Sequence, residues 1–188
     1  KPMDVLPLWV ADMDFQVSSY IQEALSGSVA HGIFGYSEAE GSYFEAVAGW
    51  MSRHYGWNVE ETWLVKTPGI VFALAQAVRA FTEPGDAVLL QQPVYYPFSQ
   101  VIRDNGRKIV DNTLVQGEDG RYRIDFADFE EKIRSCKVKL FFLCNPHNPV
   151  GRVWTREELL RLGDICEKYG VIVVSDEIHA DFVFEGSH

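Results

Sequence analysis

The sequence has little positive charge, few cysteines and no long apolar run. It holds 17 Lys and Arg against 27 Asp and Glu, which gives a formal net charge of −10 at pH 7. This balance argues against nucleic acid and anionic membrane as main partners, because both select a basic face. No apolar run approaches the length of a membrane span, and no basic segment followed by an apolar core marks a signal peptide. We therefore expect a cytoplasmic protein with a small-molecule ligand.

The three cysteines, Cys136, Cys144 and Cys166, are odd in number, and no two of them have C-x-x-C spacing. Two of them lie inside apolar or amphipathic stretches. We interpret them as buried, reduced thiols of a cytosolic protein. A catalytic cysteine is the less favoured alternative.

The chain does have the length and composition of a globular domain. Its 188 residues are 47% hydrophobic and 23% charged, which is ordinary for a soluble protein and sufficient for one domain with its own core. We find no internal repeat, low-complexity tract or linker.

From residue 60 onward, segments with strand character alternate with segments of helix character. The predicted strands are Thr62–Lys66, Ala87–Gln91, Arg107–Leu114, Val138–Leu143 and Val171–Val174. The predicted helices are Ile70–Phe81, Pro97–Arg103, a short one from its cap Asp125 to Arg134, and one that begins after Thr155. This alternation indicates an α/β fold, with a mostly parallel sheet and helices on both faces.

Two of these helices carry further signals. Ile70–Phe81 is so apolar that we expect most of its surface to be buried. Thr155 and Glu158 have the spacing of a capping box, and Gly170 stands where a helix-ending glycine is expected.

Ligands of such sheets bind beyond the carboxyl ends of the strands. The loops at these positions are 67–71, 92–97, 144–151 and 175–179. In the first loop, Gly69 allows backbone N–H groups to approach an anion at a helix N-terminus, although on this feature alone a plain strand-to-helix turn is the favoured interpretation. In the second loop, Tyr95 is suited to stacking on a flat ring, or it simply packs the loop.

The other two loops hold polar groups directly after buried strands. Asn145 to Gly151 contains two Asn-Pro steps, which fix an irregular loop, and its asparagines can both donate to and accept from a ligand. The carboxylate of Asp176 costs desolvation unless it has a partner. Asp176 should therefore face a cation such as a protonated ring nitrogen, while Glu177 points elsewhere. The alternatives are an asparagine-rich turn and an Asp that caps a turn.

Six motifs span nearly the whole chain. They are WVADMDF (Trp9–Phe15), FGYS (Phe34–Ser37), TPGIV (Thr67–Val71), PVYYPF (Pro93–Phe98), NPHNPVGRVW (Asn145–Trp154) and SDEIHADF (Ser175–Phe182). In this order they resemble the fold-type-I pyridoxal-phosphate (PLP) enzymes of the aspartate aminotransferase superfamily, and most closely the branch of cystalysin and cystathionine β-lyase. The resemblance implies a three-layer large domain with a mostly parallel sheet, incomplete at its C-terminus. Residues 1–60 would form an N-terminal arm and helices, and residues 61–188 the first part of the PLP-binding domain.

The resemblance also implies roles for single side chains. Asp176 would pair with the pyridinium nitrogen and keep it protonated, which makes the ring an electron sink for negative charge at the substrate Cα. Asn148 would hydrogen-bond the phenolic oxygen of the cofactor, and Tyr95 would stack on its ring. His179 stands where many aminotransferases carry a tyrosine, and histidine there agrees with the lyase branch.

The phosphate of the cofactor would be held by the backbone N–H groups of Gly69, Ile70 and Val71. Tyr36 is similar to the tyrosine that reaches the phosphate of the neighbouring subunit, which implies a homodimer with shared active sites. No metal is implied. The lysine that forms a Schiff base with PLP in this family matches no lysine of the chain, and the small domain is missing too. We therefore expect the chain alone to be inactive.

The favoured function is a carbon–sulfur β-lyase, which removes the Cα proton of cystathionine or a cysteine-like amino acid and releases thiol, pyruvate and ammonia. An aminotransferase is the main alternative, because it needs the same electron sink. A PLP-binding regulator that acts through a protein partner is an alternative of another class. A nucleotide-binding domain is disfavoured because neither G-x-G-x-x-G nor a P-loop occurs.

The resemblance finally predicts how the strands are arranged. Val138–Leu143, Val171–Val174, Ala87–Gln91 and Arg107–Leu114 should form one mostly parallel sheet. Thr62–Lys66 should lie apart from them, with no strand partner inside this chain.

Overall fold

The structure is a computed structural model, and it describes residues 4–6, 10, 13–39 and 41–184. The chain divides into two compact units, Lys1–Val47 and Ala48–His188. The first unit contains helix α1 (Ser19–His31) and the start of α2 (Gly41–Tyr55), and none of its described side chains is buried. The motif Trp9–Phe15 lies partly outside the described residues. Among the described residues, the buried core therefore belongs to the second unit.

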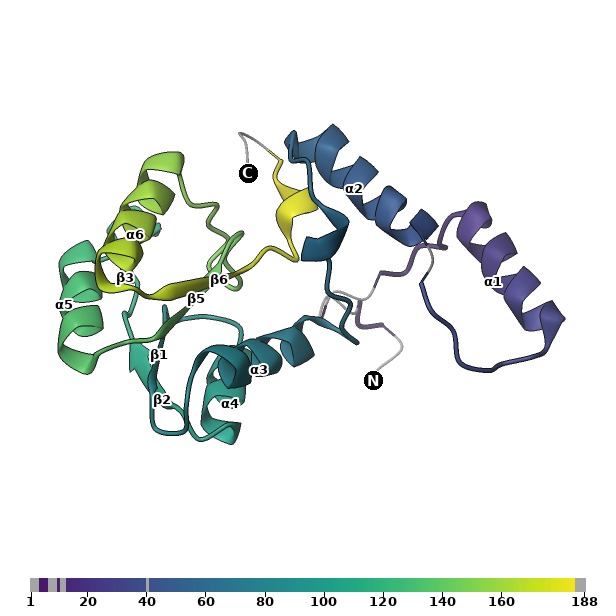
Figure 1. Cartoon of the computed structure of the whole chain (residues 1–188). Coiled ribbons are helices and arrows are strands. Elements are labelled where there is room, and N and C mark those ends of the chain that lie inside the picture. Colours follow the sequence, from purple (N-terminus) through teal and green to yellow (C-terminus); the bar gives the residue numbers. More distant parts are fainter. Residues whose placement is uncertain (1–3, 7–9, 11–12, 40, 185–188) are drawn as a thin grey trace. The chain divides into compact units, whose positions relative to one another are not determined.

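The second unit is built on four parallel strands in the spatial order β2-β1-β5-β6 (Figure 1). The strands are β1 (Ala87–Leu90), β2 (Lys108–Asp111), β5 (Leu140–Cys144) and β6 (Ile172–Asp176). Every residue of β1 and β5 is buried, as expected for central strands that are covered on both faces. The prediction of one parallel sheet from these four segments is confirmed.

Helices cover both faces of this sheet (Figure 1). Helices α3 (Ile70–Phe81) and α4 (Pro97–Asp104) pack on one face, and α5 (Phe126–Cys136) and α6 (Arg156–Tyr169) pack on the other. This three-layer arrangement confirms the predicted α/β fold class. No described helix is both long enough and apolar enough to cross a membrane.

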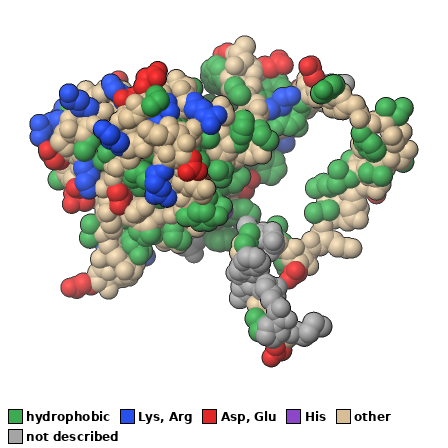
Figure 2. Space-filling view, turned by 90° about the horizontal axis from the view of Figure 1, so that it is seen from below, with side chains coloured by type: hydrophobic (Ala, Val, Ile, Leu, Met, Phe, Trp, Pro, Cys, Tyr) green, Lys and Arg blue, Asp and Glu red, His purple; other side chains and the backbone are tan. Residues whose placement is uncertain are grey.

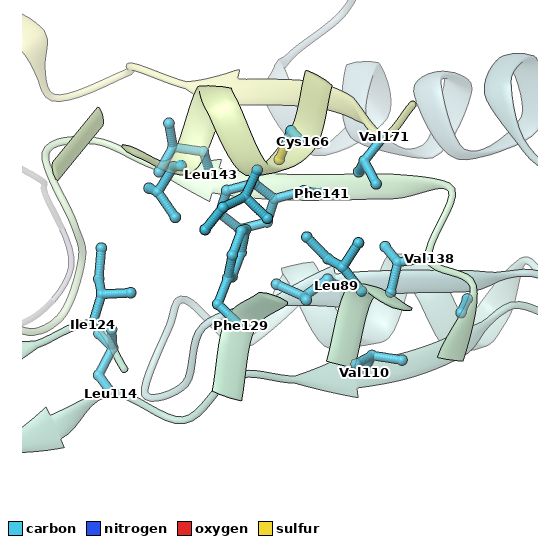
Figure 3. Packing of buried hydrophobic residues seen from close by; sticks show 14 of the residues in the cluster. Leu89, Val110, Leu114, Ile124, Phe129, Val138, Phe141, Leu143, Cys166 and Val171 are labelled. Atoms are coloured by element: carbon cyan, nitrogen blue, oxygen red, sulfur yellow. The ribbon is translucent and has the colours of Figure 1, made fainter. Parts of the chain in front are cut away.

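The layer of α5 and α6 contains the larger hydrophobic cluster among the described residues. Figure 3 shows Phe129 of α5 meeting Phe141 of β5, and their ring centroids lie 5.0 Å apart in an edge-to-face arrangement. Both side chains are fully buried, and Leu162 and Cys166 of α6 extend the same cluster. We refer to this side of the sheet as the α5/α6 face.

Local sequence signals begin and end the helices of the α5/α6 face. The carboxylate of Asp125 accepts hydrogen bonds from the N–H groups of Ala127 and Asp128, both at 3.0 Å. The predicted capping box forms in both directions between Thr155 and Glu158. Gly170 ends α6 with φ 65°, a left-handed conformation that favours glycine. These predictions are confirmed.

Helix α3 is less buried than its composition predicts. Leu74 and Val78 are buried against the sheet. In contrast, Ile70, Phe72 and Phe81 are 41% to 49% exposed. The expectation that most of the α3 surface is buried is therefore wrong for the described structure, because only one stripe of the helix meets the sheet and α4. Apolar side chains at the surface are visible among the charged ones in Figure 2.

The segment Thr62–Lys66 is not a strand, so that prediction is wrong. Residues Glu61–Trp63 form a 3-10 turn, in which the N–H groups of Trp63 and Leu64 donate to the carbonyls of Glu60 and Glu61 at 3.0 Å. These donors are satisfied locally, whereas a strand would need a neighbour. Within the described residues the segment pairs with none of the four strands, which confirms that part of the prediction.

Two smaller features also differ from the sequence analysis. A hairpin of β3 (Val115–Gln116) and β4 (Tyr122–Arg123), which was not predicted, lies between β2 and α5. All three cysteines are free, but Cys136 is exposed, because it lies in the last turn of α5. Only Cys144 and Cys166 are buried thiols, as predicted.

Candidate cofactor site

Four predicted site residues follow neighbouring strands of the sheet. Tyr95 comes after β1, Asn148 after β5, and Asp176 ends β6 with His179 just beyond it. Because β1, β5 and β6 are parallel neighbours, their carboxyl ends meet at one edge of the sheet. We refer to this group of four residues as the carboxyl edge.

The loop after β5 is held in one shape by hydrogen bonds from Trp154. The backbone N–H of Trp154 donates to Oδ1 of Asn145, and its indole Nε1 donates to the carbonyl of Cys144, both at 3.0 Å. Inside the loop, the N–H of His147 donates to the carbonyl of Arg152 at 2.7 Å. These hydrogen bonds fix the NPHNPVGRVW loop, and the loop fixes the position of Asn148 at the carboxyl edge.

The thiol of Cys144 forms two hydrogen bonds with the same loop. Its Sγ accepts from the N–H of Asn148 and donates to the carbonyl of Pro146, each at 3.5 Å. Burial raises the pKa of the Cys144 thiol to about 11, so the group stays protonated at neutral pH and keeps its donor. The sequence predicts this cysteine only as a buried thiol. Its position at the end of an apolar strand, next to the Asn-Pro motif, is the sequence signal that indicates a contact with this loop.

Tyr95 is tied to the Asn148 loop by its backbone. Its N–H donates to the carbonyl of Asn148 at 3.0 Å, which joins the loops after β1 and β5. The Tyr95 side chain is 41% exposed and meets the Tyr96 ring edge-on at 5.3 Å. One face of a partly exposed ring at this place is suited to stacking on a planar ligand.

Asp176 is a buried carboxylate at the end of β6. It is 8% exposed, and its Oδ1 accepts from the N–H of Ile178 at 3.1 Å. It makes no ion pair with any described residue. Burial raises the pKa of Asp176, and the Ile178 hydrogen bond and the nearby His179 oppose this shift. Glu177 is exposed and accepts from the hydroxyl of Ser175, so the two acids point to different surroundings, as predicted.

The predicted phosphate residues lie at the start of α3. Gly69 has φ 132°, and a Cβ added there would meet no heavy atom within 4 Å, so the backbone conformation and not crowding calls for glycine. The first helical bond runs from the N–H of Ala73 to the carbonyl of Gly69 at 3.1 Å. Ile70 and Val71 lie in the first turn of the helix, before this bond. The backbone N–H groups of a first turn have no acceptor within the helix, so they favour a bound anion.

The predicted phosphate residues are described by their own surroundings. Among the described residues, Gly69, Ile70 and Val71 form no hydrogen bond with the carboxyl edge. Tyr36 belongs to the first unit, where its side chain is fully exposed. The described part of the chain contains no cluster of His, Cys, Asp or Glu that could hold a metal ion.

The geometry fits PLP, a planar ring with a cationic nitrogen and an anionic tail. Asp176 is a buried carboxylate that forms no ion pair with a described residue, and Tyr95 offers an aromatic face. The first turn of α3 provides free N–H groups for a phosphate. These groups are of the right chemical kinds, and Asp176 and Tyr95 follow strands at the edge where ligands of parallel sheets bind.

Comparison with known proteins agrees with this interpretation. Residues 4–188 match the model of the family "Aminotransferase class I and II". The chain is 52% identical to cystathionine β-lyase PatB of Bacillus subtilis over 183 residues, which is 97% of this chain and 47% of the relative. Among solved structures, cystalysin of Treponema denticola, which contains PLP, aligns with a TM-score of 0.92 and 39% identity over 98% of this chain and 47% of that protein.

A PLP-bound protein from Clostridium difficile 630 aligns with a TM-score of 0.93 and 42% identity, over 98% of this chain and 48% of that protein. The chain spans about half the length of the curated relatives that it matches. The family match, by contrast, covers nearly all of the chain itself, and it agrees with the resemblance stated from the motifs. The chain belongs to the aminotransferase class I and II family.

Proposed function

We propose that this chain is the cofactor-binding part of a PLP-dependent carbon–sulfur β-lyase that acts on cystathionine or cysteine-like amino acids. The observation that carries the proposal is Asp176, whose buried carboxylate has no cation among the described residues. A protonated ring nitrogen supplies that cation. The 52% identity to a protein named cystathionine β-lyase supports the lyase chemistry.

When it is bound, PLP supplies an electron sink for negative charge at the substrate Cα. The task of Asp176 is to keep the ring nitrogen protonated. Tyr95 would cover one face of the ring, and Asn148 would hydrogen-bond its phenolic oxygen with a side chain positioned by the rigid loop. His179 adds a polar group beside Asp176, with which it interacts electrostatically.

The phosphate would be bound by the N–H groups of Gly69, Ile70 and Val71, and by Tyr36 from the other subunit of a homodimer. We propose that residues 1–60 form an arm and helices that serve this assembly, and that residues 61–188 form the first part of the PLP-binding domain. A cytoplasmic location is part of the same proposal.

Pyruvate formation tests the lyase assignment. The protein expressed from its complete gene should release pyruvate from cystathionine without an added keto acid, and the variant Asp176→Ala should not. Conversion only in the presence of a keto acid would instead establish the aminotransferase alternative. If PLP changes neither the absorbance nor the activity of the protein, the cofactor proposal fails as well.

Mixed dimers test the shared site. A subunit with Tyr36→Phe and a subunit with Asp176→Ala, each of low activity alone, should recover activity when co-expressed. If Tyr36 acts across the interface, both substitutions fall in one site and the other site is intact. No recovery in purified mixed dimers would show that Tyr36 serves its own subunit.

A further inference from the structure

His147 is a buried ionisable side chain to which the proposed function assigns no task. Its residue is 2% exposed, and burial lowers the pKa of its imidazole, so the ring is neutral at pH 7. The ring meets that of Trp154 edge-on at 5.5 Å. A buried histidine in van der Waals contact with an aromatic ring is often only a packing residue, but the hydrogen bonds of His147 indicate more.

The ring of His147 reaches the loop that carries Tyr95. Its Nε2 lies 3.0 Å from the carbonyl oxygen of Pro93, which is two residues before Tyr95. A carbonyl can only accept, so Nε2 carries the proton and donates. The other nitrogen, Nδ1, is buried and has no hydrogen-bond partner among the described residues. The backbone groups of Cys144 and Gln91 also interact with the ring, but the bond to Pro93 is the one that reaches the Tyr95 loop.

Two contacts besides those with the loop after β5 fix the segment from Pro93 to Tyr95: Val94 packs against the core, and the carbonyl of Tyr95 accepts from the N–H of Phe98 at 3.1 Å. Proline has no N–H, and no described residue hydrogen-bonds to the backbone of Val94. The segment is held to the loop after β5 at two points, by His147 at the carbonyl of Pro93 and by Asn148 at the N–H of Tyr95, both at 3.0 Å. His147 and Asn148 are sequence neighbours on the rigid loop, so one structure sets both contacts.

We propose that His147 is a positioning residue for Tyr95. Through the Nε2–H to Pro93 bond it sets the position of the Tyr95 ring, and therefore how tightly PLP is stacked. The inference rests on the proposed function, because it takes Tyr95 as the residue that stacks on the cofactor. His147 itself does not touch the cofactor in this account.

A matched pair of variants separates the hydrogen bond from packing. Gln and Met are similar in size and shape, and both lose the ring that packs on Trp154, but only Gln keeps a donor near the place of Nε2. The measurement is the dissociation constant of PLP from the cofactor-free protein, expressed from its complete gene, with the melting temperature of each variant beside it. His147→Met should weaken PLP about tenfold, the order of one aromatic stacking contact, and His147→Gln should weaken it clearly less.

The same pair in the Tyr95→Ala background tests the route of the effect. If His147 acts through Tyr95, the difference between Met and Gln should vanish there, since coupled residues are not additive. An undiminished difference in that background, or equal effects of Met and Gln in the parent protein, overturns the proposal. If wild-type protein binds no PLP, the proposed function has failed instead.

A measurement on the wild-type protein remains decisive if both variants unfold. The ¹⁵N spectrum of the histidine rings should show His147 as the neutral tautomer with its proton on Nε2. A proton on Nδ1 would leave no donor for the carbonyl of Pro93 and would overturn the proposal.

Discussion

The α5/α6 face and the carboxyl edge belong to the same sheet, but their polar groups differ in whether they have hydrogen-bond and ion-pair partners. On the α5/α6 face, Asp125 caps a helix with two hydrogen bonds, and Arg152 pairs with Glu158 at 2.7 Å. At the carboxyl edge, Asp176 has no cation among the described residues. In the loop that carries Asn148, Nδ1 of His147 has no hydrogen-bond partner among the described residues. Polar groups of the first kind hold the fold together, whereas those of the second kind cost stability, and for Asp176 a bound ligand explains that cost.

The largest effect on stability is expected on the α5/α6 face. Phe129→Ala removes a fully buried ring that meets Phe141, and should lower the free energy of unfolding by about 3–5 kcal/mol. Urea unfolding measures this loss of stability. Tyr96→Ala is the control, because its side chain is 71% exposed and its loss should be much smaller. Equal losses would show that this face is not the core of the protein.

The largest effect on activity is expected at the carboxyl edge. Asp176→Ala should lower turnover by about 100-fold, since one positioned electrostatic partner is worth this order, while leaving the fold intact. Asp176→Glu should retain more activity. Glu177→Ala is the matched control, because that neighbour is exposed, and it should stay near wild type. Near wild-type turnover in Asp176→Ala would rule out its assigned role.

Two aspartates should respond with opposite signs when stability is measured without cofactor. Asp125→Ala removes the cap of α5 and should destabilise the protein by about 1 kcal/mol. Asp176→Asn removes a buried charge that forms no ion pair with a described residue and should stabilise the cofactor-free protein by about 1 kcal/mol. Added PLP should reverse the second result, because only wild type then gains the ion pair. Destabilisation by Asp176→Asn without PLP would mean that the carboxylate has a structural partner.

The pH dependence sharpens this test. Since burial raises the pKa of Asp176 above its ordinary value of 3.8, the folded protein binds the proton more tightly than the unfolded chain does. Stability therefore falls as pH rises through this range. The advantage of Asp176→Asn should be complete at neutral pH and should disappear as pH falls through the raised pKa toward 3.8. An advantage that does not change with pH would point to a packing effect.

The features that the sequence predicted well are those with local causes. Asp125, the capping box at Thr155 and the ending at Gly170 all act within one helical turn, and all are present. Thr62–Lys66 was wrongly predicted as a strand, because its apolar pattern says nothing about whether a neighbouring strand exists to pair with it. The hairpin of β3 and β4 was missed because strands of two residues show no periodicity.

The candidate site was predictable only in part, for the same reason. Asp176, Asn148 and Tyr95 stand out because polar or aromatic groups follow apolar segments with strand character. The expectation that the strand before Asp176 is buried is wrong for the described structure, because β6 is the last strand of the sheet and most of its residues are exposed. The supporting contacts were not predictable, since His147 and Pro93 are 54 residues apart in sequence and meet only after the sheet forms. Cys144 looked like any buried thiol until its hydrogen bonds to the Asn148 loop were seen.

The pKa of Asp176 itself tests the central claim most directly. It can be followed by NMR in protein with ¹³C-labelled aspartate carboxyls, with Asp176→Asn used to assign the signal. Without cofactor, the pKa should lie above its ordinary value, because burial raises it. With PLP bound, a cationic ring nitrogen beside the carboxylate should lower the pKa markedly. A pKa of Asp176 that is the same with and without PLP would contradict the account.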